Sequence, residues 1–427
     1  MKKLPQIPDE KSFYRLPFEK GTFTLKEDTL LSHSIYRKSP SYFREKIKNI
    51  SYKNEILTLS IRLEAEPKNR QYVYLKVLRD ELLVSCSAGT TPTFLSRFAF
   101  FTLFDLAHND WSNYFRKYYW PDFFDPKTGK SKYLTVINDR SGLDVEEKTM
   151  YPEFYKPGFE VLDLKNEPPT IIRSPIGSID LEGVPEEIEA IAFCIAKNRN
   201  GLCYAEHFPF LIPAHVKLYD SKDRIKIFTK FLHNEGDFDR IKLSAKQERL
   251  AKICFKMKEL AGIDREDNWK KKKFTREDLE KGRQLLEIWH ELFELLLAQR
   301  FVAEYKTHGF KSLERKPHRN SLYICNFRKD RPKLIIVKKD KGDYLTIELK
   351  LKIKGRTYKP CYPVLIPFIS AHYAPREFYL LGNLADILLI NFFSKSNFKM
   401  AVLKPHYKDE IMEFVNQLAE RYELIES

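Results

Sequence analysis

The sequence lacks the features that mark several large classes of protein. Its 427 residues hold six scattered cysteines and no C-x-x-C pair, which argues against a disulfide framework. No stretch of about 18 apolar residues occurs, and no apolar run follows the charged N-terminal residues to make a secretory signal. We therefore expect a cytoplasmic protein with reduced thiols and no membrane partner.

Complete catalytic motifs are also missing. The sequence has no Gly-x-Ser-x-Gly, His-Glu-x-x-His or Gly-x-Gly-x-x-Gly pattern. Gly129-Lys130-Ser131 does not complete a phosphate-binding loop, because Phe124 stands where that loop needs a glycine. An Asp-Pro-x-x-Gly turn that begins at Asp125 explains the tripeptide better.

A zinc-protease motif is likewise incomplete. His290 and Glu291 begin the pattern, but Glu294 occupies the position of its second histidine. The surrounding residues form a leucine-rich helical pattern, and we expect His290, Glu291 and Glu294 to lie at its surface. From these patterns we predict no catalytic residue, no bound metal and no other cofactor.

Apolar residues are plentiful: they make up 43% of the chain, with 14% aromatic, which is ample for packed cores. We predict an α+β, multi-domain fold with antiparallel hairpins and a central helical pair. Four segments are expected: an α+β domain over 1–150, a Pro-rich linker with a β-hairpin over 151–240, the helical pair over 241–305, and a basic α+β domain over 306–427 that ends in an amphipathic helix.

Local signals place the helical pair and a later hairpin. Ser244 and Gln247 form a capping box before the first helix, and Leu292 and Leu296 fall on the apolar stripe of the second. The run 333–355 alternates as a hairpin does, so one of its faces is predicted to be core and the other charged.

Positive charge is concentrated in one part of the chain. The formal net charge is +15, and residues 306–360 hold 17 Lys or Arg against 5 Asp or Glu. Such a block is either a solvated face or a face that binds a polyanion. Under the second interpretation, phosphates of a nucleic acid, DNA first among them, contact side chains of this block and of the earlier run of four lysines. These candidate contact residues are Lys270, Lys271, Lys272, Lys273, Arg315, Lys316, Arg319, Arg328, Lys329, Arg331, Lys338, Lys339, Lys350 and Lys352.

An enzymatic alternative centres on Glu348-Leu349-Lys350. This tripeptide matches the E-x-K half of the PD-(D/E)xK nuclease pattern, in which two carboxylates hold magnesium and the lysine steadies the attacking water. The preceding strand begins Pro332-Lys333, so a lysine stands where the other carboxylate is needed. The charged row of a hairpin also produces E-x-K by chance, and both interpretations stay open.

The stretch ELLVSCSAGTTPTFLSRF, residues 81–98, has the layout of a strand, a turn and a helix start. It resembles a SWIM zinc finger, in which such a layout presents four ligands. Aligned by shape, Cys86 keeps the first ligand position, whereas Ala88, Ser96 and Phe98 occupy the others. We interpret it as a metal-free relic in which burial of Phe94, Leu95 and Phe98 replaces coordination, or as an unrelated strand-turn-helix.

A wider resemblance rests mainly on the tail, VLIPFISAHYAPREFYLLGNLADILLINFFSKSNFKMAVLKPHYKDEIMEFVNQLAERYELIES, residues 364–427. This tail, together with AFCIAKNRNGLCYAEHFPFLIPAHVKLYDSKDRIKIFTKFL over 192–232, is similar to the region that precedes the motor in bacterial Swi/Snf-type helicases. The sequence contains no nucleotide-binding loop, acidic metal box or arginine finger of such a motor.

The resemblance implies a DNA-binding, helicase-associated accessory protein of bacterial type, without ATPase activity of its own. It would act alone, dock a separately encoded helicase motor, or be one part of a longer helicase. The alternatives are the metal-dependent nuclease centred on Glu348 and Lys350, and an interaction scaffold whose charge serves only solubility.

Overall fold

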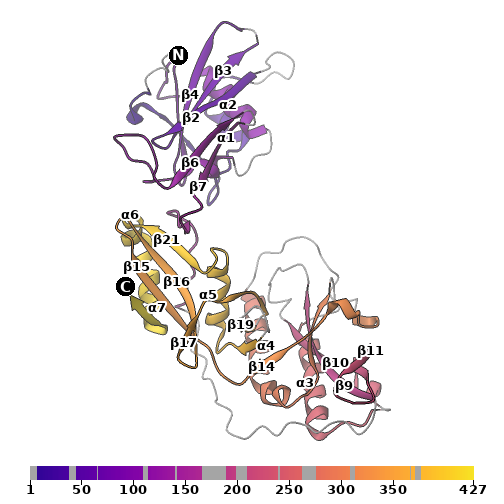
Figure 1. The fold of residues 1–427 in the computed structure, drawn as a ribbon. Helices are drawn as coiled ribbons and strands as arrows, with labels where there is room; N and C mark the ends of the chain where they lie inside the picture. The colour runs from indigo at the N-terminus through magenta and orange to yellow at the C-terminus, as the bar shows by residue number, and fades with distance from the viewer. Residues whose placement is uncertain are drawn as a thin grey trace. The chain divides into compact units, whose positions relative to one another are not determined.

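The structure is a computed structural model that describes residues 7–37, 45–64, 66–108, 114–139, 142–165, 189–198, 209–238, 241–261, 276–307, 313–365, 367–370 and 377–427. It confirms the α+β, multi-sheet fold (Figure 1). The chain divides into two compact units. Unit 1 comprises Met1–Val161, Lys341–Leu345 and Met400–Met412, and unit 2 comprises Leu162–Asp340, Thr346–Lys399 and Glu413–Ser427.

Unit 1 is built on a five-stranded antiparallel sheet. Its order is β1 (Tyr14–Pro17), β5 (Glu81–Cys86), β4 (Arg70–Val77), β3 (Ile56–Leu63) and β2 (Glu45–Lys53). Helices α1 (Glu27–Ser32) and α2 (Arg97–His108) and the hairpin β6 (Leu134–Asp139) with β7 (Gly142–Glu147) complete most of the unit. Strand β8 (Glu153–Phe154) pairs in parallel with β21 (Lys399–Leu403).

The strand, turn and helix predicted around Cys86 are present, because β5 ends at Cys86 and α2 begins at Arg97. Leu95 and Phe98 are buried in the core of unit 1 as expected. The expectation for Phe94 is wrong, because its side chain is 37% exposed. Burial raises the pKa of the Cys86 thiol, so this cysteine is a packed core residue rather than a reactive one.

The turn predicted at Asp125 is confirmed. A carboxylate oxygen of Asp125 accepts hydrogen bonds from the amides of Lys127 and Thr128 at 2.7 and 3.1 Å. Gly129 closes the turn by donating its amide to the Asp125 carbonyl at 2.8 Å, with a φ of 64° that glycine adopts without strain.

The largest sheet of unit 2 combines strands from distant parts of the chain. Its order is β11 (Ile225–Phe231), β10 (Phe210–Leu218), β9 (Glu189–Asn198), β12 (Val302–Thr307) and β13 (Leu322–Ile324). The pairing of β9 with β10 is antiparallel, as the hairpin prediction required. Strand β12 pairs with β9 in parallel, which joins the segment after the helical pair to the segment before it.

Helices α3 (Ala245–Ala261) and α4 (Arg276–Leu297) form the predicted pair. The capping box of α3 is confirmed, because the amides of Ser244 and Gln247 each donate to the other residue's side chain, at 3.1 and 3.2 Å. On α4, the Trp289 indole donates to the Pro209 carbonyl at 2.9 Å, and its ring lies 5.0 Å from that of Phe368. Helix α4 thus contacts the residue that precedes β10 of the large sheet and also a strand of a second sheet.

That second sheet has the order β14 (Asn326–Arg328), β20 (Glu377–Leu380), β19 (Phe368–Ser370) and β18 (Cys361–Leu365). The predicted hairpin is present as β15 (Lys333–Asp340) and β16 (Tyr344–Ile353), with β17 (Arg356–Tyr358) paired to β16. Helices α5 (Leu384–Ser394), α6 (Lys404–His406) and α7 (Met412–Arg421), with a π-helical turn over Tyr407–Ile411, lead to β22 (Glu423–Glu426).

The observed division differs from the four predicted segments. Strands of the 151–240 and 306–427 segments share the large sheet, and the helical pair packs on it, so most of these three segments belongs to unit 2. Residues 151–161, 341–345 and 400–412 belong to unit 1 instead. The prediction that the 306–427 segment ends in the amphipathic helix is also wrong, because residues 423–426 follow α7 as a strand that pairs in parallel with β15. Within the described ranges, no helix combines the length and apolar character that crossing a membrane requires.

The buried stripe of α4 gives a first testable prediction. Leu292 is 0% exposed, so Leu292→Ala leaves a cavity and is expected to lower the free energy of unfolding by roughly 2–5 kcal/mol. Glu291→Ala, at the next position but exposed, is the matched control and is expected to change it by less than about 0.5 kcal/mol. Equal urea midpoints for both variants would show that the stripe is not core.

A buried carboxyl gives a second prediction. Asp386 on α5 is 7% exposed and accepts a hydrogen bond from the Tyr422 hydroxyl at 3.0 Å. Burial raises the pKa of Asp386 to about 6. Because the folded pKa exceeds the unfolded one, the stabilising contribution is full below about pH 4 and is lost as the pH rises through about 6.

We therefore expect Asp386→Asn to be more stable than the wild type at about pH 8, by up to about 3 kcal/mol. The advantage should shrink as the pH is lowered, because the wild-type carboxyl then becomes neutral as well. Denaturant unfolding across this pH range measures the difference. An advantage that does not change with pH would contradict the assignment.

Candidate nucleic-acid interface

The charged face of the β15–β16 hairpin already has carboxylate partners. Lys338 Nζ lies 2.7 Å from a carboxylate oxygen of Glu426, and Lys352 Nζ lies 2.7 Å from one of Glu423. Both glutamates belong to β22, which pairs with β15. A phosphate at this face would have to compete with these two carboxylates.

Glu348, the candidate nuclease carboxylate, lies among lysines. Its carboxylate oxygens are 3.2 Å from Lys399 Nζ, 3.5 Å from Lys350 Nζ and 3.7 Å from Lys339 Nζ. Burial alone would raise the pKa of Glu348, but these lysines lower it overall. Magnesium needs oxygen ligands, and in the described part of the chain no group of three or more His, Cys, Asp or Glu residues is placed to hold a metal ion.

Among the other predicted contact residues, Arg328 and Arg331 lie against side chains of the protein itself. Arg328 Nε donates to a carboxylate oxygen of Glu377 at 3.0 Å. The Arg331 guanidinium lies 5.1 Å from the centre of the Phe293 ring, and burial lowers its pKa. Lys329 and Arg315 are exposed. Lys270 to Lys273 fall outside the described residues.

The expectation of surface positions is confirmed for Glu291, which is exposed, but it is wrong for His290 and Glu294. Both are only partly accessible, and His290 Nε2 and Glu294 Oε1 are buried. Burial, reinforced by the positive charge of Arg331, lowers the pKa of His290 to about 4. The imidazole is therefore neutral at physiological pH.

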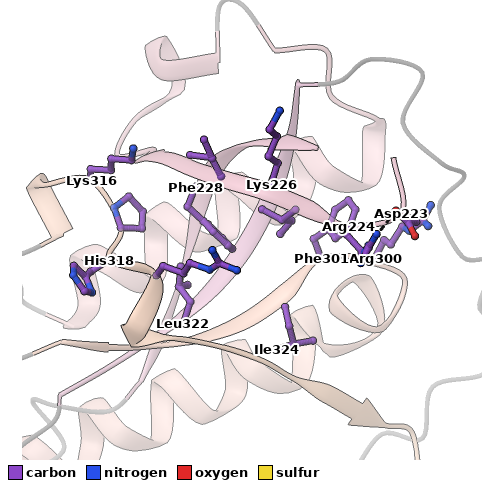
Figure 2. Close-up of a pocket in the computed structure, with 14 residues that line it drawn as sticks. Asp223, Arg224, Lys226, Phe228, Arg300, Phe301, Lys316, His318, Leu322 and Ile324 are labelled. Carbon is purple, nitrogen blue, oxygen red and sulfur yellow. Dashed lines mark ion pairs between the residues drawn. The ribbon is translucent and has the colours of Figure 1, made fainter. Parts of the chain in front are cut away.

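Two of the predicted residues, Lys316 and Arg319, line a cavity of about 1050 Å³ in unit 2 (Figure 2). The cavity is bounded by β11 and β13, the two edge strands of the large sheet. Its remaining basic lining is Arg224, Lys226 and Arg300, with His318 beside Lys316 and a single carboxylate, Asp223. Five Lys or Arg side chains against one Asp make this a strongly positive hollow.

The floor of the cavity is apolar. Ala190, Ala192, Val216, Leu218 and Phe301 form a buried cluster, with Ile225 and Phe228 packed against it. Phe301, Ile225 and Phe228 also line the cavity. Three apolar residues of the cavity lining therefore belong to, or pack against, a buried cluster of the large sheet.

The cavity's cations differ from those of the hairpin in their pairing. Arg224 lies 3.6 Å from Asp223, and both side chains are largely exposed. Among the described residues, no ion pair joins Lys226, Arg300, Lys316 or Arg319 to a carboxylate. In the part of the chain that the structure describes, no carboxylate pairs with these four side chains, which favours the approach of a phosphate.

Sequence reasoning missed Arg224, Lys226 and Arg300. The alternation of DRIKIF, residues 223–228, indicates a strand, but it does not indicate which residues lie next to that strand. These residues join Lys316 and Arg319 only because β12 pairs in parallel with β9, and a non-local pairing leaves no local pattern.

Comparisons with known protein families, with curated proteins and with solved structures gave no match for this chain.

The lysine cluster around Glu348 gives a third prediction. Glu348→Gln leaves Lys339, Lys350 and Lys399 without their shared counter-charge, so we expect a loss of stability of about 1 kcal/mol at low salt. Raising the salt to about 1 M should remove most of this loss by screening. The control is Glu426→Gln, which removes a 63% exposed carboxylate paired with one lysine, and should cost less. Salt-independent loss in both variants would contradict the electrostatic account.

Proposed function

We propose that this protein is a non-catalytic nucleic-acid-binding accessory protein whose contact surface is the basic cavity of unit 2. The observation that carries the proposal is the five cations at one hollow, four of which have no described carboxylate partner. Lys and Arg side chains bind phosphates with release of counterions, which needs no base contact. The similarity of the tail to pre-motor regions of Swi/Snf-type helicases supports DNA as the nucleic acid and a helicase motor as a docking partner.

The proposal predicts salt-dependent binding. A labelled oligonucleotide should bind at low salt, and the logarithm of the affinity should fall linearly with that of the salt concentration, by about 0.7 per phosphate contacted for a single strand and about 0.9 for a duplex. Replacing Lys316 and Arg319 with Gln should make the single-strand slope shallower by about 1.4. Fluorescence anisotropy between about 25 and 300 mM salt measures both quantities.

The matched control replaces Lys338 and Lys352 with Gln. It removes the same charge, but from lysines already paired with Glu426 and Glu423, so the slope should stay close to the wild-type value. If the slope becomes shallower in this control and does not change in the cavity variant, the nucleic-acid interface lies on the hairpin instead. Absence of binding at low salt would refute the proposed function.

The nuclease alternative is tested in the same assay with magnesium added. The proposal expects intact plasmid DNA after incubation, because Glu348 is surrounded by lysines rather than by further carboxylates. Cleavage by the wild type that Glu348→Gln abolishes would establish the nuclease instead. Glu348→Gln is otherwise expected to bind DNA as well as the wild type, or slightly better.

A further inference from the structure

Basic side chains lie at both ends of the cavity, with Lys226 between them (Figure 2). Figure 2 shows Arg224 and Arg300 at one end, near Asp223, and Lys316 and His318 at the other, with Phe228 and Leu322 between them. A ligand that satisfies this lining carries negative charge at intervals and apolar groups between the charges. A fatty acid has one carboxylate, and inorganic polyphosphate has no apolar part, so neither matches both features.

Some apolar residues of the cavity lining are exposed, although binding of phosphates alone needs no apolar surface. Ile324 on β13 is 65% exposed and Ile227 on β11 is 42% exposed, and both line the cavity. Phe228 adds partly exposed aromatic surface, whereas Phe301 is 8% exposed and lies in the floor. The faces of nucleobases stack on aromatic and apolar side chains whatever their sequence, so bases are the groups that would cover these residues.

The shape of the site separates a single strand from a duplex. A duplex keeps its bases stacked inside and presents phosphates on a convex surface, so it would touch the rim and leave the floor uncovered. An unpaired strand can turn its bases into the hollow while its phosphates meet the cations. The volume of about 1050 Å³ lies at the upper end of the range for small-molecule sites, which reaches roughly 1000 Å³.

A tyrosine beside the cavity extends the same pattern. The Tyr219 ring is 44% exposed, and the guanidinium of Arg224 and the ammonium of Lys226 lie 5.5 and 5.9 Å from its centre. An exposed ring with cations at its face provides a stacking position next to phosphate-binding groups. We infer that the cavity between β11 and β13 binds a segment of single-stranded nucleic acid, with bases on the apolar floor and phosphates at the cationic ends; this inference rests on the proposed function.

The test compares three ligands of equal length and label with the intact protein: a thymidine 15-mer, a 15-base-pair duplex, and a 15-mer of abasic deoxyribose phosphates. The thymidine strand and the abasic strand carry the same phosphates, so their difference reports the bases. We expect the thymidine strand to bind at least about tenfold more tightly than either of the others at about 100 mM salt, the effect of stacking roughly one base.

The variant Ile324→Ser should remove much of that preference while leaving the salt slope unchanged. Its matched control is Ile425→Ser, which alters an isoleucine 39% exposed on β22, another edge strand, and should keep the wild-type preference. Circular dichroism of both variants confirms that they fold. Tighter binding of the thymidine strand, lost only in Ile324→Ser, supports the inference.

Other results overturn it. Equal affinity for the three ligands, with the salt slope intact, would leave the proposed function standing and refute the role of the bases. ATP is titrated as a fourth ligand. If it binds as tightly as the thymidine 15-mer, a single nucleotide fills the site and the inferred strand segment is wrong. Failure of all the oligonucleotides to bind at low salt would refute the proposed function, and the inference with it.

Discussion

Internal charge pairing decides which part of this basic chain is open to an external anion. Two acidic residues of the short strand β22 neutralise Lys338 and Lys352, and Glu348 is shared by three further lysines. The hairpin therefore carries many lysines and little unbalanced charge. At the cavity between β11 and β13, five cations face one aspartate, and that imbalance is the basis of the proposed function.

The cavity depends in turn on one strand pairing. Parallel pairing of β12 with β9 places β13 at one edge of a sheet whose other edge is β11. Lys316 and Arg319, which lead into β13, thereby line the same hollow as Arg224 and Lys226 from β11. The helical pair connects these segments in the sequence and packs against the sheet. The helices of the connection between β11 and β12 are therefore themselves part of the packed core.

Local patterns in the sequence were sufficient for most individual elements. The capping box at Ser244, the turn at Asp125 and the buried Leu292 each depend on residues within a few positions of one another, and the structure confirms all three. What could not be predicted is non-local: the pairing of β12 with β9, the strand formed by residues 423–426, and the carboxylates that neutralise the hairpin. The candidate site was accordingly predicted only in part, through Lys316 and Arg319.

Ultraviolet cross-linking of a single-stranded oligonucleotide, followed by mass spectrometry of the modified peptides, tests the central claim most directly, because it locates the nucleic acid without any substitution. The account predicts cross-links within residues 219–228 and 316–324, the segments that contribute Tyr219, Phe228 and the β13 side of the cavity. Cross-links confined to the hairpin of residues 333–353 would contradict it, because they would show that nucleic acid displaces the glutamates paired there rather than entering the cavity.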